Sequence, residues 1–369
     1  QGATSPTVRL ETTSSGVVIT GTAQATDFNS TSDIKLKTNI QAIEDPLAKV
    51  VQIEGVSFNW KEDNRPALGV IAMVPNSLGP GELLTHYGTD EQKERFLKPM
   101  AAGDEIWAQA WSEPGAGSDM AAIRSKAVRD GDAYVITGQK IWSSRAVFAD
   151  WCFGLFRTDP ESSRHHGLSK ILVPLDSPGL TVRPIAQLDG DPGFAELFFD
   201  EVRVPVDNLL GPEHGGWGVA MATAGFERGL LLRSPARFQA AAARLVKLYK
   251  QNANRLSSGI KEQVLQAWGD TERFTAATYA LVAQVDSGAS ISSEASANKI
   301  FWSEMDRAMH RTAMTIMGMH AELEEGEGAI ENGRWLDGYM FSLAGPIYAG
   351  TNEIQRNILA ERVLGLPRQ

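Results

Sequence analysis

The chain has 369 residues, of which 43% are hydrophobic, and it carries a formal net charge of −10. This length and composition indicate a globular protein of two or three domains, and the acidic balance without basic runs excludes a nucleic-acid or anionic-membrane surface. The single cysteine, Cys152, excludes an intrachain disulfide and indicates a reducing, cytoplasmic setting. We expect no membrane span, no signal peptide and no metal site, because the apolar runs are too short and the histidines lack further ligands at useful spacing.

The first 72 residues differ in composition from the rest of the chain. Residues 1–31 are rich in Thr and Ser and alternate apolar with polar residues, which predicts short strands of a β-stalk. Residues 32–72 begin with SDIKLKTNI and contain a short helical pattern and one strand pattern. This segment resembles part of the self-cleaving intramolecular chaperone of phage tail spikes and fibres.

The chaperone resemblance implies a self-cleavage pair. The chain would be cut just before Ser32, with Lys37 acting as the base. The chaperone's usual C-terminal helices are absent, so the segment is a fragment joined to another fragment, as in a chimera. We therefore expect no cleavage between Thr31 and Ser32.

Residues 73–369 read as a helical segment, a strand-rich domain and a helical domain. Residues 73–104 are helical, and Thr89 with Gln92 predicts a capping box. Residues 105–210 hold short strand patterns separated by turns, which predicts an antiparallel β-barrel; the patterns cover 133–142, 151–159, 169–177, 180–188 and 195–205. Residues 211–369 predict a helical bundle, with runs at 216–252 (kinked at Pro235), 260–286, 292–320 and 351–363. The fold class is therefore α+β.

Three short motifs suit ligand binding. WSEPGAGSD (111–119) combines glycines, which let a backbone approach a ligand closely, with the hydroxyls of Ser112 and Ser118. KIWSS (140–144) places an indole beside two hydroxyls, and PIYAGTNEIQR (346–356) is a Gly-bearing loop that enters a helix. Each motif taken alone is also compatible with a surface loop, a core Trp or an ordinary helix start.

Glu227 is the acidic residue in TAGFERGLLLR, an otherwise apolar helical pattern. Its neighbours at helical spacing are uncharged, and Arg228 points about 100° away, so burial would raise the pKa of Glu227 and make it a base. Taken alone, the segment favours a carboxylate that pairs with a distant cation.

Taken together in this order, these motifs make residues 76–369 resemble the acyl-CoA dehydrogenase family. The resemblance implies a middle β domain, a C-terminal four-helix bundle, FAD as cofactor, an acyl-CoA substrate, an electron-transfer flavoprotein as electron acceptor, and a homo- or hetero-tetramer. It also implies site residues: Trp111, Ser112, Trp142, Ser143 and Ser144 at the flavin, Thr351 and Glu353 at its nucleotide, and Ser118 at CoA.

The resemblance assigns the catalytic base as well. Many members carry a Glu where this chain has Ala349, whereas a branch similar to isovaleryl-CoA dehydrogenases places its base before an Arg on the first long C-terminal helix. Glu227 occupies that position, which makes it the expected base, with Arg228 and the N–H of Ala349 at the substrate. The expected activity is FAD-dependent α,β-dehydrogenation of a fatty-acyl or steroid side-chain CoA thioester in β-oxidation.

The family's first helices are missing from residues 1–72, which implies an open pocket and weak activity. Two alternatives stay open: a non-catalytic subunit of a mixed tetramer, and a phage tail-fibre chaperone fragment that carries a passenger domain.

Overall fold

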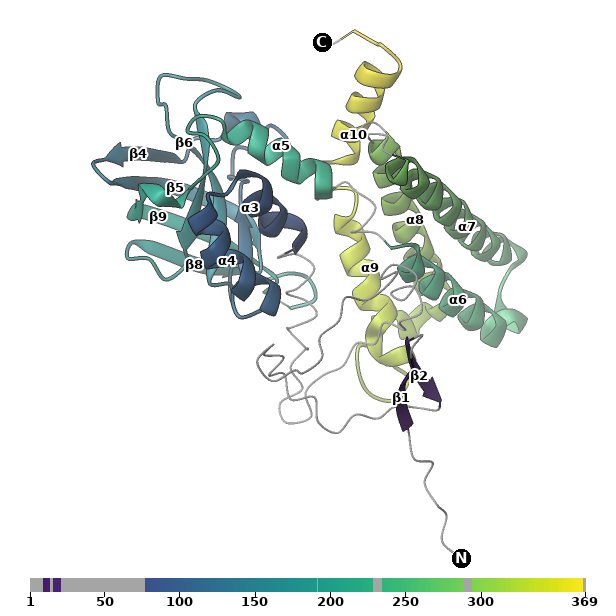
Figure 1. Ribbon diagram of the computed structural model, residues 1–369. Coiled ribbons are helices and arrows are strands. Elements are labelled where there is room, and N and C mark those ends of the chain that lie inside the picture. The colour runs from purple at the N-terminus through teal and green to yellow at the C-terminus, as the bar shows by residue number, and fades with distance from the viewer. Residues whose placement is uncertain are drawn as a thin grey trace, which may run out of the picture. The chain divides into compact units, whose positions relative to one another are not determined.

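A computed structural model of the chain describes residues 9–13, 16–20, 77–190, 192–227, 234–287 and 294–367. The chain divides into two units, Gln1–Ile71 and Ala72–Gln369. In the first unit, strands β1 (Arg9–Thr13) and β2 (Gly16–Thr20) pair antiparallel (Figure 1). This hairpin confirms the short strands predicted within residues 1–31. The segment 32–72, with its predicted helix and strand, lies outside the described residues.

Three short helical elements open the second unit: η2 (Ser77–Gly81), α3 (Glu82–Tyr87) and α4 (Asp90–Ala102). The predicted capping box is confirmed, because the backbone N–H of Gln92 donates to the Thr89 hydroxyl at 3.2 Å and the N–H of Thr89 donates to the Gln92 side chain at 3.1 Å. The Gln92 amide nitrogen also donates to the carbonyls of Asp207 and Leu209, at 2.7 and 2.9 Å. The cap therefore starts α4 and joins it to the strand-rich domain.

Among the described residues of this unit, eight strands form one sheet: β3 (Trp107–Ala110), β4 (Lys126–Asp130), β5 (Ala133–Ser144), β6 (Trp151–Arg157), β7 (Leu168–Pro174), β8 (Leu180–Ile185), β9 (Phe194–Pro205) and β10 (Leu209–Leu210). Their order is β10, β7, β6, β4, β5, β9, β8, and β3 pairs with β6 off this path. All five strands predicted from β-rich runs between turns are confirmed.

The predicted closed antiparallel barrel is wrong. In the part of the chain that the structure describes, the edge strands β8 and β10 do not pair with each other, so the sheet stays open. In addition, β3 and β4 both pair with β6 in parallel. Alternation along a strand reports which face is buried and carries no information about the partner strand, so neither feature could be predicted locally.

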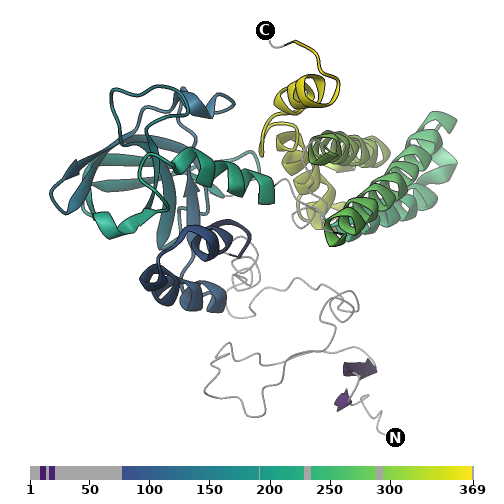
Figure 2. The ribbon, with the colours of Figure 1, turned by 45° about the horizontal axis from the view of Figure 1, so that its top comes forward.

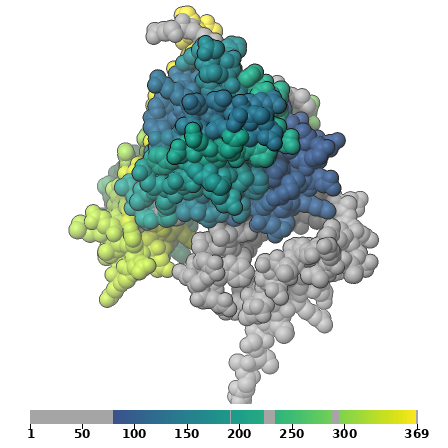
Figure 3. All heavy atoms as spheres, turned by 90° about the vertical axis from the view of Figure 1, so that its left-hand side faces the viewer, coloured from purple at the N-terminus to yellow at the C-terminus, as the bar shows by residue number. Residues whose placement is uncertain are grey.

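Apolar side chains fill both faces of the sheet. One core includes Tyr134, Ile136, Phe156 and Leu197, and the free thiol of Cys152 lies in it without exposure. Burial raises the pKa of Cys152 to about 12, so the thiol stays protonated and inert. The other face packs against α3, α4 and the first helix after the sheet, which lie beside it in Figure 1 and Figure 2. Figure 3 shows the blue segment with α3 and α4 beside the teal strand residues.

In the described part of the chain after the sheet, the α-helices are α5 (Gly216–Glu227), α6 (Pro235–Asn252), α7 (Ser258–Asp286), α8 (Glu294–Met317), α9 (Arg334–Ala344) and α10 (Asn352–Ile358). Helices α6, α7, α8 and α9 pack on one another as a bundle (Figure 1). The sequence predicted α6, α7 and α8 but not α9, and it predicted a bundle helix at 351–363 instead. Helix α5 instead packs on β6 and β7.

The predicted single helix 216–252 with a kink at Pro235 is wrong. Pro235 is the first residue of α6, and the Ser234 hydroxyl caps that helix by accepting from the N–H of Ala236 at 3.3 Å. A proline is well placed there because the first turn of a helix needs no N–H from it. The run is therefore divided between a helix on the sheet and a helix of the bundle.

Candidate functional site

The motif WSEPGAGSD forms the loop that leaves β3. Glu113 and Ala116 exchange two backbone hydrogen bonds of 3.1 and 3.0 Å, which close a turn at the motif's centre. Trp111 is buried, with 7% of its surface exposed, and the ammonium nitrogen of Lys170 lies 3.7 Å from its ring centroid. The indole of Trp111 is thus fixed at the base of the loop, whereas Ser112 and Ser118 face a cavity.

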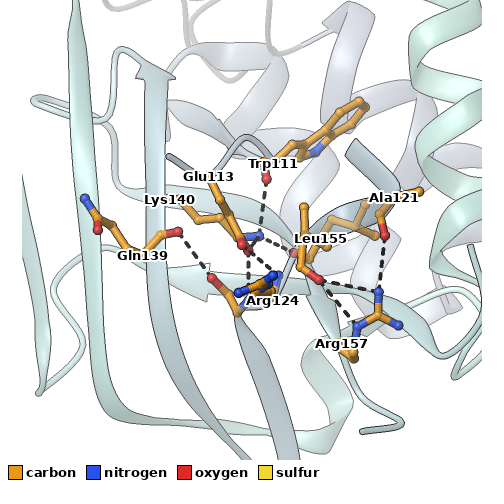
Figure 4. A network of polar contacts seen from close by, with 10 residues as sticks. Trp111, Glu113, Ala121, Arg124, Gln139, Lys140, Leu155 and Arg157 are labelled. Atoms are coloured by element: carbon orange, nitrogen blue, oxygen red, sulfur yellow. Dashed lines mark hydrogen bonds and ion pairs between the residues drawn. The ribbon is translucent and has the colours of Figure 1, made fainter. Parts of the chain in front are cut away.

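A buried ion pair supports this loop from the interior of the sheet (Figure 4). The Lys140 ammonium, which has no exposed surface, donates to the Glu113 carboxylate at 2.8 Å and to the carbonyls of Trp111 and Leu155 at 3.2 and 2.6 Å. Burial lowers the pKa of Lys140 to about 8, although Glu113 partly offsets this effect. Burial raises the pKa of Glu113, but Lys140 and hydrogen bonds outweigh it and hold that pKa below its usual value.

Trp142 stands out in the motif KIWSS because of its backbone. The pairing of β5 with β9 shifts register between Lys140 and Ser143, and Trp142 within this bulge has a φ of 60°, which is rare for a bulky residue. Trp142 is 55% exposed and lines two cavities that lie beside the motifs. Strain of this kind persists where the surroundings over-determine it and is frequent at ligand sites.

The loop before α10 has two consecutive residues in the left-handed region. Ala349 has a φ of 54° and Gly350 a φ of 79°, and the Gln355 side chain donates to the Ala349 carbonyl at 3.2 Å. The Thr351 hydroxyl caps α10 by accepting from the N–H of Ile354 at 3.2 Å. A hydrogen bond to its own backbone N–H, together with the Thr351 hydroxyl, lowers the pKa of the exposed Glu353, so this carboxylate serves the helix start.

Two cavities lie beside these motifs, each with a volume of about 830 Å³. One of them brings together seven of the predicted residues: Trp111, Ser112, Ser118, Trp142, Ser144, Ala349 and Thr351. Trp142, Ser144 and Ala349 also line the other cavity, which is more apolar and includes Trp302 and Phe341. Indoles and hydroxyls on a shared wall suit a planar aromatic ligand that stacks and accepts hydrogen bonds.

The remaining predicted residues are placed differently. Ser143 is fully buried and Glu353 is exposed, and neither lines a cavity. Helix α5 ends at Glu227, but the side chain of Glu227 lies outside the described part of the structure. Arg228, Ser32 and Lys37 are also outside the described residues.

The sequence did not single out several residues of the site. Lys140 is one of them, although it shares the phase of the buried Tyr134 and Ile136 along β5, and a Lys at an inward position is the signal that would have revealed it. A second is Arg157, whose guanidinium donates to the carbonyl of Ala121 at 3.4 Å (Figure 4) and to that of His166 at 2.9 Å. It links two loops that border the cavity.

The described residues contain no group of three His, Cys, Asp or Glu side chains that could hold a metal ion. His165 lies with its ring 4.3 Å from that of Trp217, at the edge of the cavity. None of the described helices is long and apolar enough to span a membrane.

Comparison with protein families gives four matches. Models described as "Acyl-CoA dehydrogenase" match with their N-terminal domain at residues 62–104, their middle domain at 108–202 and their C-terminal domain at 214–364. A model described as "Chaperone of endosialidase" matches residues 32–72. Both resemblances predicted from the sequence are therefore confirmed.

Known proteins similar to this chain agree with the family matches. The acyl-CoA dehydrogenase IpdE1 of Mycobacterium tuberculosis is 41% identical over 290 residues, which cover 78% of this chain and 74% of the relative. The structure of the Tcur3481-Tcur3483 steroid ACAD matches with a TM-score of 0.74 and 30% identity, over 81% of this chain and 77% of that one. The ChsE4-ChsE5 complex from Mycobacterium tuberculosis matches with a TM-score of 0.71 and 31% identity, over 80% and 78% of the two chains.

Proposed function

Since the chain belongs to the acyl-CoA dehydrogenase family, a family of oxidoreductases, we propose that it binds FAD and dehydrogenates an acyl-CoA thioester between its α and β carbons. The observation that carries the proposal is the single cavity that gathers Trp111, Ser112, Trp142, Ser144 and Thr351 from three separate motifs. Residues that lie far apart in the sequence thus form one binding wall.

The residues of this wall fit a flavin. The exposed indole of Trp142 offers a face for stacking, and Ser112 and Ser144 offer hydroxyls. The indole N–H of Trp111 and the hydroxyl of Ser143 are buried and have no hydrogen-bond partner among the described residues. Buried donors of this kind are rare unless a ligand or water satisfies them. FAD, when bound, supplies the acceptor for the hydride that leaves the β carbon.

The other roles follow from position. We assign Thr351 and Glu353 to the flavin nucleotide and Ser118 to the CoA portion, because Thr351 and Ser118 lie at the cavity. Glu353, which is exposed and serves the start of α10, would act there mainly by orienting Thr351. The backbone N–H of Ala349 would donate to the thioester carbonyl, which makes the α proton more acidic.

The proton acceptor in this proposal is Glu227, the last residue of α5. Trp217 and Met221, which lie earlier in the same helix, line the cavity, so α5 borders the site. Ala349 has a methyl side chain and cannot accept a proton. Glu227 would take the α proton on the face of the substrate opposite the flavin, and Arg228 would lie at the substrate.

The first experiment is to purify the protein and record its visible spectrum and its flavin content per chain. The proposal predicts a bound flavin, and its removal should leave an apoprotein that takes up FAD again. A chain that neither carries nor binds FAD would contradict the proposal and would favour a phage-chaperone fragment with a passenger domain. A variant with Trp142→Ala should bind FAD more weakly, because the stacking face is lost.

For partners, we propose a tetramer with an electron-transfer flavoprotein as acceptor. A second candidate function is a non-catalytic subunit of a mixed tetramer, which is favoured by the two similar structures whose names join two different proteins. Full flavin occupancy in a homotetramer would support catalysis, whereas flavin binding only after mixing with a second chain would support the alternative. The steroid link of one structure suggests that bulky acyl groups should be tested first.

A further inference from the structure

The loop 111–119 presents Ser112 and Ser118 to the cavity, and Lys140 in the interior of the sheet binds it by hydrogen bonds. Lys140 has no exposed surface, and its ammonium group makes three hydrogen bonds, which is the full number of its donors. Two of the acceptors, the carbonyl of Trp111 and the carboxylate of Glu113, belong to the loop. The third is the carbonyl of Leu155 in β6, so Lys140 on β5 joins the loop to two strands.

Glu113 also connects the loop to the residues that precede β4. Its two carboxylate oxygens accept from the backbone N–H groups of Arg124 and Ser125, at 2.7 and 2.9 Å. Arg124 and Ser125 directly precede β4 and follow the segment that carries Ser118. One carboxylate thus connects the start of the loop to the residues just before β4, and that carboxylate pairs with Lys140 (Figure 4).

Lys140 also lies close in the sequence to Trp142, the residue that we expect to stack on the flavin. Trp142 follows Lys140 by two residues in the β5 bulge, and the N–H of Ile141 between them donates to the carbonyl of Ser112 at 2.9 Å. A displacement of Lys140 would therefore move both the loop and the bulge. Lys140 and Ile141 thus connect the motif at 140–144 with the motif at 111–119.

We propose that Lys140 is a positioning residue that sets the geometry of the flavin-facing wall by fixing loop 111–119 and the Trp142 bulge to the sheet interior. The inference rests on the proposed function, because the wall is taken to face FAD. Lys140 is buried behind the wall and touches no ligand, so its effect is transmitted through Trp111, Glu113 and Ile141.

The test compares Lys140→Met with the purified wild type in two readouts. Methionine keeps the length of the side chain and removes the ammonium group. Amide hydrogen exchange should become at least about tenfold faster at Glu113, Ala116, Arg124 and Ser125. These N–H groups donate to acceptors on Glu113 and Ala116, and this part of the loop opens more often once the Lys140 ammonium no longer fixes the Glu113 carboxylate. The dissociation constant for FAD, measured by titration of the apoprotein, should rise by about tenfold.

Tyr134→Phe is the matched control. Tyr134 is also buried on β5, and its hydroxyl donates to Glu213 at 2.6 Å, so this variant loses a buried hydrogen bond in the same strand away from both cavities. It should leave exchange in residues 111–125 and FAD affinity unchanged. If it weakens FAD binding as much as Lys140→Met does, general destabilisation explains the effect and the proposal is overturned.

The outcomes separate this inference from the proposed function. Unchanged exchange in Lys140→Met overturns the positioning role, as does faster exchange with unaltered FAD affinity. A wild type that binds no FAD contradicts the proposed function, and it overturns the inference as well, since no flavin wall then exists; the exchange data still report whether Lys140 holds the loop. If Lys140→Met does not fold, Lys140→Met with Glu113→Gln removes both charges and is judged by the same two readouts.

Discussion

Replacement of Glu113 by Gln tests the energetics of the buried ion pair. The Glu113 side chain is 9% exposed and accepts from Lys140, Arg124 and Ser125 at 2.8, 2.7 and 2.9 Å. A glutamine has one acceptor oxygen and an NH₂ group, so at least one backbone N–H would face a donor. Lys140 would also keep a buried charge without its counter-ion.

The magnitude follows from these contacts. A hydrogen bond to a charged group contributes about 1.5–3 kcal/mol, and breaking a buried ion pair by removing one partner costs about 3–5 kcal/mol. We therefore expect Glu113→Gln to lower the free energy of unfolding by about 3–5 kcal/mol. For a folded unit the size of Ala72–Gln369, the midpoint of thermal unfolding should fall by roughly 10 °C.

The assay is urea unfolding followed by tryptophan fluorescence and circular dichroism. Asp130→Asn is the matched control, because Asp130 pairs with Arg203 at 2.7 Å in the same sheet but with both side chains more than half exposed. Exposed pairs contribute about 0–1 kcal/mol, so this variant should lose less than about 1 kcal/mol. Equal losses for Glu113→Gln and Asp130→Asn would refute the reasoning that burial determines the strength of the Glu113 contacts.

Further predictions concern the pH dependence, the bundle and the N-terminal segment. Burial lowers the pKa of folded Lys140 to about 8 from its ordinary value of 10.5, so the unfolded chain binds more protons between these values. The stability contributed by Lys140 therefore rises with pH across that window. The stability of the wild type relative to Lys140→Met should therefore increase from pH 8 to pH 10.5, and a pH-independent difference would contradict the shift. In the bundle, Asn352→Leu removes the buried oxygen that accepts from Lys299 at 2.8 Å and from Ser303 at 3.1 Å, so thermal unfolding should occur at a lower temperature. An unchanged midpoint would show that these bonds add nothing. Finally, intact-mass measurement should find no fragment that begins at Ser32, since cleavage needs a complete folded chaperone; such a fragment would disprove this expectation.

Local signals in the sequence predicted local structure well. The Thr89 capping box and the five β-rich runs between turns each depend on residues a few positions apart, and all of them are present. The short strands β3 and β4 were not predicted, because WAQA is too short to show alternation and KAVRD is mostly polar. Their parallel pairing with β6 joins residues far apart in the sequence, and so would the pairing of β8 with β10 that a closed barrel needs.

The candidate site shows the same division. The sequence motifs indicated Trp111, Trp142 and Thr351, because indoles, hydroxyls and glycines in short runs are visible without a structure. The positive φ of Trp142 and the reach of Lys140 to Glu113 could not be predicted, since the first depends on a register shift and the second joins residues 27 positions apart. Pro235 was wrongly predicted to kink a helix, because a proline is compatible both with a kink inside a helix and with the first turn of a new helix.

The most direct test of the central claim is an anaerobic titration of the FAD-loaded protein with acyl-CoA thioesters, performed on the wild type and on Glu227→Gln. The measured quantity is the loss of the visible flavin band at equilibrium. We predict that the wild type bleaches with at least one thioester and that Glu227→Gln retains FAD without bleaching, because the amide keeps the shape of the side chain and removes the base. Bleaching of Glu227→Gln to the same extent as the wild type would contradict the assignment of Glu227. A wild type that stays oxidised while Ala349→Glu bleaches would show that this chain has lost its base.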